Sequence, residues 1–394
     1  MVICIVTEHL RLMRFYLLAV GLWPYYRTNL VRLQFFLCFS ILLSFVIFQL
    51  TPFLVDDCTV NIIIKNLSIT SYFSIYMIAH VAGWASDDKI KGLLEHLQLI
   101  CNQLKDENEF AIIKKYGNHA KRYAAVLTSF SMCSMFGIIV LPFWPRILTI
   151  VSLINESQTY AKVQITTEYF INQEKYFYLI LLHLETVLWI GTSTLMGIGL
   201  LLLGYCQHMC GIFSIASYRI EHAMSMLENS SLDTELKMYK EMTYAIDIHC
   251  TAIKYSELLT LSFENICLPL ALLIVISTSM NLFGIFKNML IEGDIETCML
   301  HVIIIGVLFI LLYLLNSLGQ DITDHSNYVL STAYNVKWYI APLRIQKLLL
   351  VLLQRGNKTF TLTIAKMLLL SRESFATLTK ASISYFTILY SMQQ

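Results

Sequence analysis

Residues 297–320 read TCMLHVIIIGVLFILLYLLNSLGQ, a run that contains no Asp, Glu, Lys or Arg. A helix of ~20 apolar residues is long enough to cross the hydrocarbon core of a bilayer, so this stretch predicts a membrane-spanning helix. The whole chain has a matching composition: 57% of its residues are hydrophobic, 14% are charged, and its mean hydropathy is +0.63. Soluble domains are nearer about 25% charged. We therefore expect an integral membrane protein that lies in a lipid bilayer.

Working outward from this run, six further segments suit a bilayer crossing. Four are free of charged residues: 33–55, 66–86, 123–145 and 265–286. The other two are 178–203, which holds Glu185, and 374–394, which holds Lys380. At 1.5 Å per residue the last segment would span roughly 32 Å, which is enough to cross. The expected fold class is an all-α integral membrane protein in which residues 1–394 form a single seven-helix subunit.

The Lys and Arg residues predict the orientation of these helices. The N-terminal segment and every second connecting segment hold 22 of the 28 Lys and Arg residues, whereas the alternate connecting segments hold five. Basic residues concentrate in cytoplasmic loops, so the N-terminus is predicted in the cytoplasm and the C-terminus outside. The long segments 235–261 and 324–353, both on the predicted cytoplasmic side, are expected to form helices that continue the membrane helices and pack together.

The residues indicate no catalytic, metal-binding or cofactor-binding site. No nucleotide-binding, hydrolase or metalloprotease motif is present, so neither an enzyme nor a cofactor is expected. Cys206, His208 and Cys210 are read as small buried residues at a helix end rather than as metal ligands. A net charge of +1 gives no reason to expect nucleic acid as a partner. Asn155 begins an Asn-Glu-Ser glycosylation acceptor pattern, and its use is left open. His80 and His301 are each expected to hydrogen-bond to a neighbouring helix.

The predicted outer halves of the second, third, fourth and sixth spans combine aromatic and small residues. Aromatic rings supply an apolar wall and glycine leaves room between helices, which suits a pocket for a small, mostly apolar ligand. Ordinary helix packing in lipid uses the same residue types, so both interpretations stay open. The candidate ligand-binding residues are Tyr72, Phe73, Tyr76, Ser134, Gly137 and Leu141.

A polar stripe follows the last predicted helix. Five side chains recur at spacings of three and four residues, which places them on one helical face. The rest of the segment is mostly apolar, so we expect this helix to have lipid or protein on one side and water on the other. The stripe consists of Thr377, Lys380, Ser384, Thr387 and Ser391.

A series of residues in the C-terminal quarter follows a known family pattern. In order, these are Gly319-Gln320, Ser326, Ala333-Tyr334, Trp338-Tyr339, Arg355, Leu362-Thr363, Phe375 and Ser384-Tyr385-Phe386-Thr387. The chain resembles the insect odorant receptors, most strongly over residues 319–394. The related gustatory receptors end in a Thr-Tyr pattern followed by Gln-Phe. Ser391 and Met392 stand at the corresponding positions here, which disfavours that alternative.

The resemblance implies a function and a set of residues. Members of this family are odorant-gated, non-selective cation channels in the cell membrane of sensory neurons, and a tuning subunit assembles with a co-receptor subunit into a tetramer. The ligand would be a small volatile odorant. The anchor between subunits would fall on roughly residues 219–261 and 321–370. The last helix would line the pore, with Ile388 as the gate and Thr387, Ser391 and Met392 beside it.

Two alternatives of other classes are disfavoured by the residues. A G-protein-coupled receptor would have its N-terminus outside, and the chain carries no Asp-Arg-Tyr or Asn-Pro-x-x-Tyr pattern at a helix end. A transporter built from inverted repeats would show internal similarity and helices interrupted by Gly or Pro, neither of which is evident.

Overall fold

The structure is a computed structural model that describes residues 10–55, 60–104, 106–144, 165, 167–172, 175–228, 232–289, 293–356 and 360–392. Within these ranges the chain is almost entirely α-helical and its one sheet is a two-stranded hairpin. Asn155 lies outside the described residues. The longer helices are α2 (Arg11–Ala19), α3 (Asn29–Leu50), α5 (Val60–Ala85), α6 (Asp87–Asn102), α7 (Glu107–Val140), α9 (Phe177–Ser225), α10 (Leu232–Lys287), α11 (Ile295–Asn335), α12 (Leu343–Gly356) and α13 (Arg372–Ser391).

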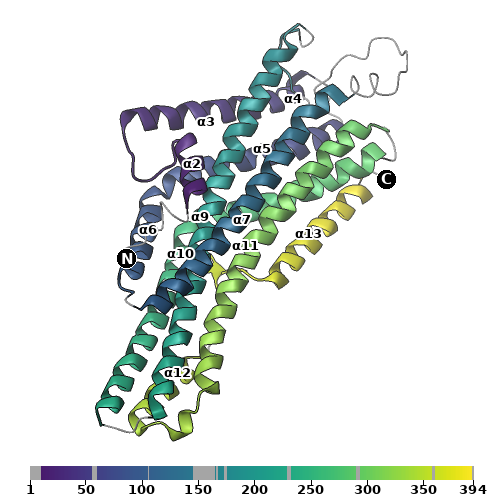
Figure 1. Cartoon of the computed structure of the whole chain (residues 1–394). Helices are drawn as coiled ribbons and strands as arrows, with labels where there is room; N and C mark the ends of the chain where they lie inside the picture. Colours follow the sequence, from purple (N-terminus) through teal and green to yellow (C-terminus); the bar gives the residue numbers. More distant parts are fainter. Residues whose placement is uncertain are drawn as a thin grey trace, which may run out of the picture.

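Three very long helices form the axis of the molecule (Figure 1). α9 has 49 residues, α10 has 56 and α11 has 41. They run side by side with α7 toward the end of the molecule that carries α12, here termed the α12 end. Segment 235–261 lies inside α10, so the prediction that it is helical is confirmed.

α9 occupies the centre of the bundle, and glycine lets other elements approach it closely. A Cβ at Gly197 would meet the Leu17 side chain at 2.6 Å, and one at Gly204 would meet the Leu10 side chain at 2.2 Å. α2 is therefore packed directly on the backbone of α9. Buried side chains of α2, α6, α9, α10 and α11 form one continuous apolar core.

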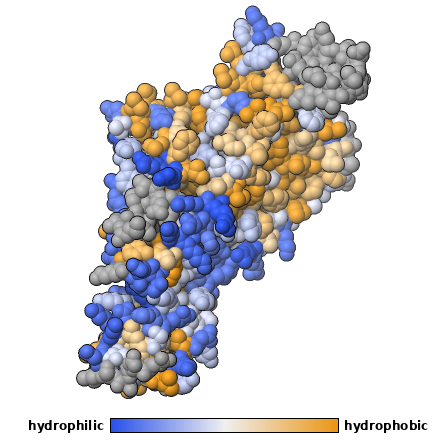
Figure 2. Space-filling view, in the orientation of Figure 1, coloured by the Kyte–Doolittle hydropathy of each residue, from blue (hydrophilic) through white to orange (hydrophobic). Residues whose placement is uncertain are grey.

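Among the residues that the structure describes, five helices are long and apolar enough to cross a membrane: Asn29–Leu54, Glu107–Phe143, Phe177–Ser225, Asp233–Lys287 and Ile295–Asn335. α5 and α13 coincide with the second and seventh predicted spans and are not among these five. Figure 2 shows the matching surface: on the visible face, apolar residues cover the half away from α12, and polar residues predominate nearer α12. The number of crossings and their direction remain predictions.

The prediction of one helix over 324–353 is wrong in its middle. α11 ends at Asn335, a single 3₁₀ turn covers Trp338–Ile340, and α12 begins at Leu343. Pro342 has no N–H to donate and disfavours the helical conformation at Ala341, whose ψ is 153°. The chain therefore reverses at this point, and α12 packs back against α10 and α11.

A small hairpin connects α12 to α13. β1 (Thr363–Ile364) pairs antiparallel with β2 (Leu368–Leu369), and the turn between them holds Ala365 and Lys366 at positive φ. Leu370 follows the hairpin and lies against Gly319 of α11, where a Cβ would meet the Leu370 Cβ at 2.2 Å. Ser371 then caps α13 by accepting a hydrogen bond from the Ser374 N–H at 3.1 Å.

Candidate functional site

A cavity of about 150 Å³ lies between five helices in the middle of the bundle, here termed the central cavity. α5, α7, α9, α10 and α11 each contribute to its wall. Leucine and isoleucine dominate the lining, which also includes Met135, Met196, Phe130 and Phe263. The wall is therefore overwhelmingly apolar and suits a small ligand held mainly by dispersion and burial.

Among the described residues, four of the five hydroxyls on this wall, all except that of Ser131, are already engaged in hydrogen bonds. Tyr72 and Tyr76 share a hydrogen bond, and the Tyr76 hydroxyl also lies 3.4 Å from Thr192 Oγ1 on α9. Ser134 Oγ donates to the Phe130 carbonyl oxygen at 3.0 Å within α7. A ligand in the cavity would therefore meet few polar groups that are not already hydrogen-bonded within the protein.

Three of the six predicted ligand-binding residues line the central cavity, namely Tyr72, Tyr76 and Ser134. The other three are not in its lining. The Phe73 ring packs on the Phe45 ring of α3, with centroids 4.7 Å apart. Gly137 faces α11, since a Cβ there would meet Ile303 Cδ1 at 3.2 Å, and Leu141 is buried where α7 ends.

Sequence reasoning included the fourth and sixth spans, which are α9 and α11, but named no lining residue on them, and it missed the contribution of α10. The lining residues of all three helices are ordinary apolar residues in apolar helices, so nothing in their pattern marks a cavity. The one available signal was glycine: Gly199 lines the cavity, and a Cβ there would meet nothing within 4 Å.

A second, smaller cavity of about 20 Å³ lies between the central cavity and the hairpin. The two share Phe263, Cys267 and Leu318, among other residues. The smaller cavity also reaches Gly319 and Leu370, directly before α13. Apolar side chains thus connect the central cavity with the start of the last helix.

α13 has one face against the bundle. The Phe375 ring meets Tyr313 of α11 with ring centroids 5.5 Å apart, and the Tyr390 ring meets Phe286 of α10 at 5.0 Å. Between them, the backbone carbonyl of Ser382 accepts a hydrogen bond from Ser279 Oγ of α10 at 2.9 Å. At 100° per residue, these side chains share one side of the helix.

The opposite face of α13 carries the predicted polar stripe. Its five side chains are exposed, and the Thr387 and Ser391 hydroxyls donate to carbonyl oxygens of their own helix at 2.7 and 2.8 Å. The Ile388 side chain is 54% exposed and Met392 is 80% exposed. The predicted gate and its neighbours therefore lie on the face that this chain leaves uncovered.

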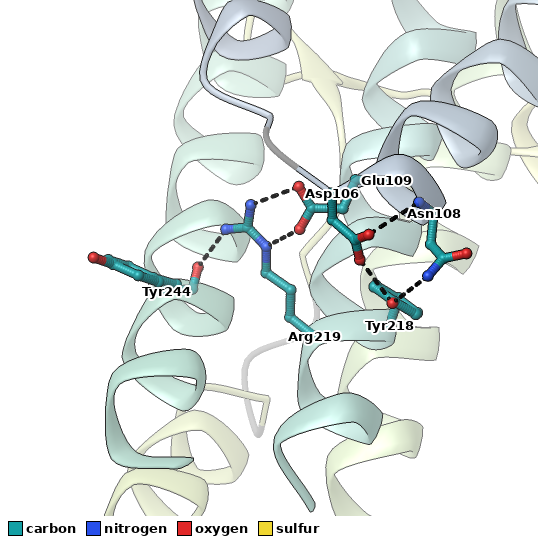
Figure 3. Close-up of polar contacts among 6 residues, drawn as sticks. All are labelled: Asp106, Asn108, Glu109, Tyr218, Arg219 and Tyr244. Carbon is teal, nitrogen blue, oxygen red and sulfur yellow. Dashed lines mark hydrogen bonds and ion pairs between the residues drawn. The ribbon is translucent and has the colours of Figure 1, made fainter. Parts of the chain in front are cut away.

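A polar cluster ties three helices together toward the α12 end, beside the start of α7 (Figure 3). Arg219 of α9 binds both carboxylate oxygens of Glu109 on α7, at 2.5 and 3.1 Å, and donates to the Tyr244 carbonyl oxygen of α10 at 3.3 Å. Beside this pair, the Tyr218 hydroxyl donates to Asp106 at 2.8 Å. That hydrogen bond holds the pKa of Asp106 below its usual range.

The other polar residues singled out in the sequence are mostly paired. His80 lies 3.2 Å from Thr194 Oγ1 and His301 lies 2.8 Å from Asn281 Oδ1, so the predicted hydrogen bonds to neighbouring helices are confirmed. Glu185 differs, because both its carboxylate oxygens are buried without a partner among the described residues. The described part of the chain holds no group of three or more His, Cys, Asp or Glu residues placed to bind a metal.

Residues 59–383 match the family described as 7tm Odorant receptor, which covers most of the chain. The chain belongs to the odorant receptor family. This is a membrane receptor family and not an enzyme family. The question for the central cavity is therefore whether it suits an odorant.

Solved structures agree with this assignment at the level of the fold. The odorant receptor chain is similar to the insect olfactory receptor OR5 from Machilis hrabei in complex with eugenol, with a TM-score of 0.75 and 13% sequence identity over 98% of this chain and 99% of that one. A second structure, of the same receptor, gives a TM-score of 0.73 with 13% identity and 98% coverage of both chains. No curated protein sequence matches this receptor.

Proposed function

We propose that this chain is the odorant-binding subunit of an odorant-gated, non-selective cation channel. The observation that carries the proposal is the central cavity, because an apolar chamber bounded by five helices is the kind of site that a small volatile molecule can occupy. Burying each CH₂ group of a ligand is worth about 0.8 kcal/mol, so affinity would come mainly from apolar contact and recognition would be broad.

The pore would be lined by the uncovered face of α13. Four copies of this helix around one axis would place Thr387 and Ser391 toward water, with Ile388 as a hydrophobic constriction and Met392 beside it. No carboxylate stands on the stripe, which agrees with poor selectivity among cations. We propose a tetramer with a co-receptor subunit, in the cell membrane of sensory neurons.

The orientation follows from the basic residues. Two of the predicted cytoplasmic segments, 235–261 and 324–353, lie toward the α12 end (Figure 1), so this end would face the cytoplasm and the end of α13 would face outside. The anchor between subunits would then be the part of α9, α10, α11 and α12 that extends beyond the bilayer.

Opening would be a shift between two populations. An odorant that binds the open conformation more tightly than the closed one favours opening by that difference in affinity. Apolar contacts from the central cavity through Phe263 and Leu318 to Leu370 offer a route by which a ligand biases the start of α13.

A matched pair of glycines tests the ligand site. At both Gly199 and Gly306 a Cβ would meet nothing within 4 Å, but only Gly199 lines the central cavity. Gly199→Ala therefore reduces the room for a ligand. We expect the potency of the largest active odorants to fall by about tenfold or more, as a mismatch of one methyl group in an apolar pocket produces. Gly306→Ala should leave potency unchanged.

The measurement is the odorant-evoked current of each variant co-expressed with the co-receptor, over a panel of volatile compounds of graded size. Equal losses in both variants, or none in either, would place the ligand elsewhere. Odour responses that persist without any channel opening, carried by a G protein, would contradict the channel proposal itself.

A further inference from the structure

A separate small cavity lies where α5, α10 and α11 meet, toward the end at which α13 finishes. Its volume is about 10 Å³, and it shares no lining residue with the central cavity. A volume of about 10–15 Å³ corresponds to a single water molecule. The residues that decide its chemistry are His301, Asn288, Gly284, Lys65 and Lys287.

The hydrogen bonds of Asn281 fix the tautomer of His301. The Asn281 amide nitrogen donates to the carbonyl oxygens of Ser277 and Ser68, at 2.7 and 2.9 Å. Its amide oxygen therefore faces His301 Nδ1, at 2.8 Å, and an oxygen of this kind only accepts. Nδ1 must carry the hydrogen, and a neutral imidazole of this tautomer presents Nε2 as an acceptor.

Asn288 presents a second acceptor. Its amide nitrogen donates to the Gly284 carbonyl oxygen at 2.8 Å, which leaves Oδ1 to face the other way. His301 and Asn288 are 0% and 3% exposed, and neither His301 Nε2 nor Asn288 Oδ1 has a partner among the described residues. Two buried acceptors thus line one cavity of molecular size.

The guest must satisfy both acceptors within this volume. An anion offers them no hydrogen, and a metal cation would meet the like charges of Lys65 and Lys287, which also line the cavity. We infer that the cavity binds one water molecule, which donates one hydrogen to His301 Nε2 and the other to Asn288 Oδ1. A buried water of this kind typically makes about three hydrogen bonds to groups that would otherwise be unsatisfied.

The bound water joins α11 to the end of α10. Asn281 extends the connection to α5 through Ser68, and Ser279, two residues before Asn281 on α10, donates to the backbone of α13. Gly284 keeps the site open, because a Cβ there would lie 2.6 Å from His301 Nε2. The site stands independently of the proposed odorant function.

An experimental density map of the full chain in its assembled channel tests the site directly. We expect a peak within roughly 2.7–3.2 Å of both His301 Nε2 and Asn288 Oδ1. The peak should be lost in Gly284→Ala and kept in Gly306→Ala, which adds the same methyl group in open space. A map that resolves other buried waters but none here overturns the inference, as does a Lys65 ammonium bonded directly to either acceptor.

A thermal-unfolding cycle gives a second readout. A water molecule that bridges two side chains couples their contributions to stability, because removing either side chain releases the water. The loss of Tm in the double variant His301→Ala with Asn288→Ala should therefore be smaller than the sum of the two single losses. Each single variant also loses its own direct hydrogen bond, but that contribution cancels in the cycle. Additive losses would therefore overturn the proposed water bridge.

Discussion

The imidazole of His249 is 1% exposed, and neither ring nitrogen has a hydrogen-bond partner in the part of the chain that the structure describes. It packs edge-on against Phe213 of α9, with ring centroids 5.7 Å apart. Leaving buried polar atoms unpaired costs about 1–3 kcal/mol, so His249→Leu should stabilise the protein by about 1 kcal/mol or more.

The matched control is His208→Leu. His208 is also fully buried, but its Nδ1 hydrogen-bonds to the Gly204 carbonyl oxygen at 2.7 Å. The same substitution should lower stability there by about 1 kcal/mol. Thermal unfolding of the purified receptor in detergent measures both. If the two variants shift Tm in the same direction, the argument from unpaired nitrogens is wrong.

The Tyr218 hydroxyl gives the receptor a pH-dependent contribution to stability. It lowers the pKa of Asp106 in the folded protein relative to the unfolded chain. The stabilisation is therefore present above the unfolded pKa of Asp106 and is lost as pH falls through the folded pKa. Tyr218→Phe should flatten the fall of Tm between about pH 5 and pH 2. Tyr178→Phe, at a side chain that is 70% exposed, should leave the profile unchanged.

At the scale of elements, the contact between α11 and the residue before α13 depends on one glycine. A Cβ at Gly319 would lie 2.2 Å from the Leu370 Cβ and 2.7 Å from the Leu370 carbonyl oxygen, so Gly319→Ala must push the start of α13 away. We expect odorant-evoked current to fall more than tenfold in this variant, while Gly306→Ala behaves as the original chain. Unchanged current in Gly319→Ala would mean that this contact takes no part in opening.

Long apolar helices were predictable because their signal is a sum over many residues. The run 297–320 and the segment 235–261 both lie inside helices of the structure. The break at Pro342 was missed although proline is the strongest local signal against a helix, because apolar residues continue on both sides of it. The two-residue strands of the hairpin were not predicted, since they are too short to show a period of two.

The site was predictable only in part, for a physical reason. Tyr72, Tyr76 and Ser134 stand out because aromatic rings and hydroxyls are unusual on an apolar helix, and they do line the central cavity. Phe73 and Leu141 share those helices but turn to other neighbours. Which side of a helix faces a cavity depends on the crossing of five helices, and no local pattern records that crossing.

Across the whole molecule, the buried ion pair between Glu109 and Arg219 joins α7 to α9 and, through Tyr244, to α10. Both side chains are largely buried, at 6% and 18% exposure. Removing one partner of such a pair leaves an uncompensated charge and costs about 3–5 kcal/mol. Arg219→Met should therefore lower Tm more than the double variant with Glu109→Met. A double variant less stable than the single one would contradict this.

Lys380 bears on which subunits can form the channel. It lies on the uncovered stripe of α13 and is exposed in the single chain. Four copies in a homotetramer would bring four ammonium groups to one level of the pore and repel cations, whereas a co-receptor subunit dilutes that charge. We predict that this chain expressed alone gives far smaller odorant-evoked cation currents than with the co-receptor, and that Lys380→Gln raises the current of the chain alone. Lys366→Gln, in the hairpin turn, should leave the current of the chain alone unchanged.

Patch-clamp recording measures these currents. Equal currents with and without the co-receptor would show that Lys380 lies off the pore. An unchanged current in Lys380→Gln would show the same.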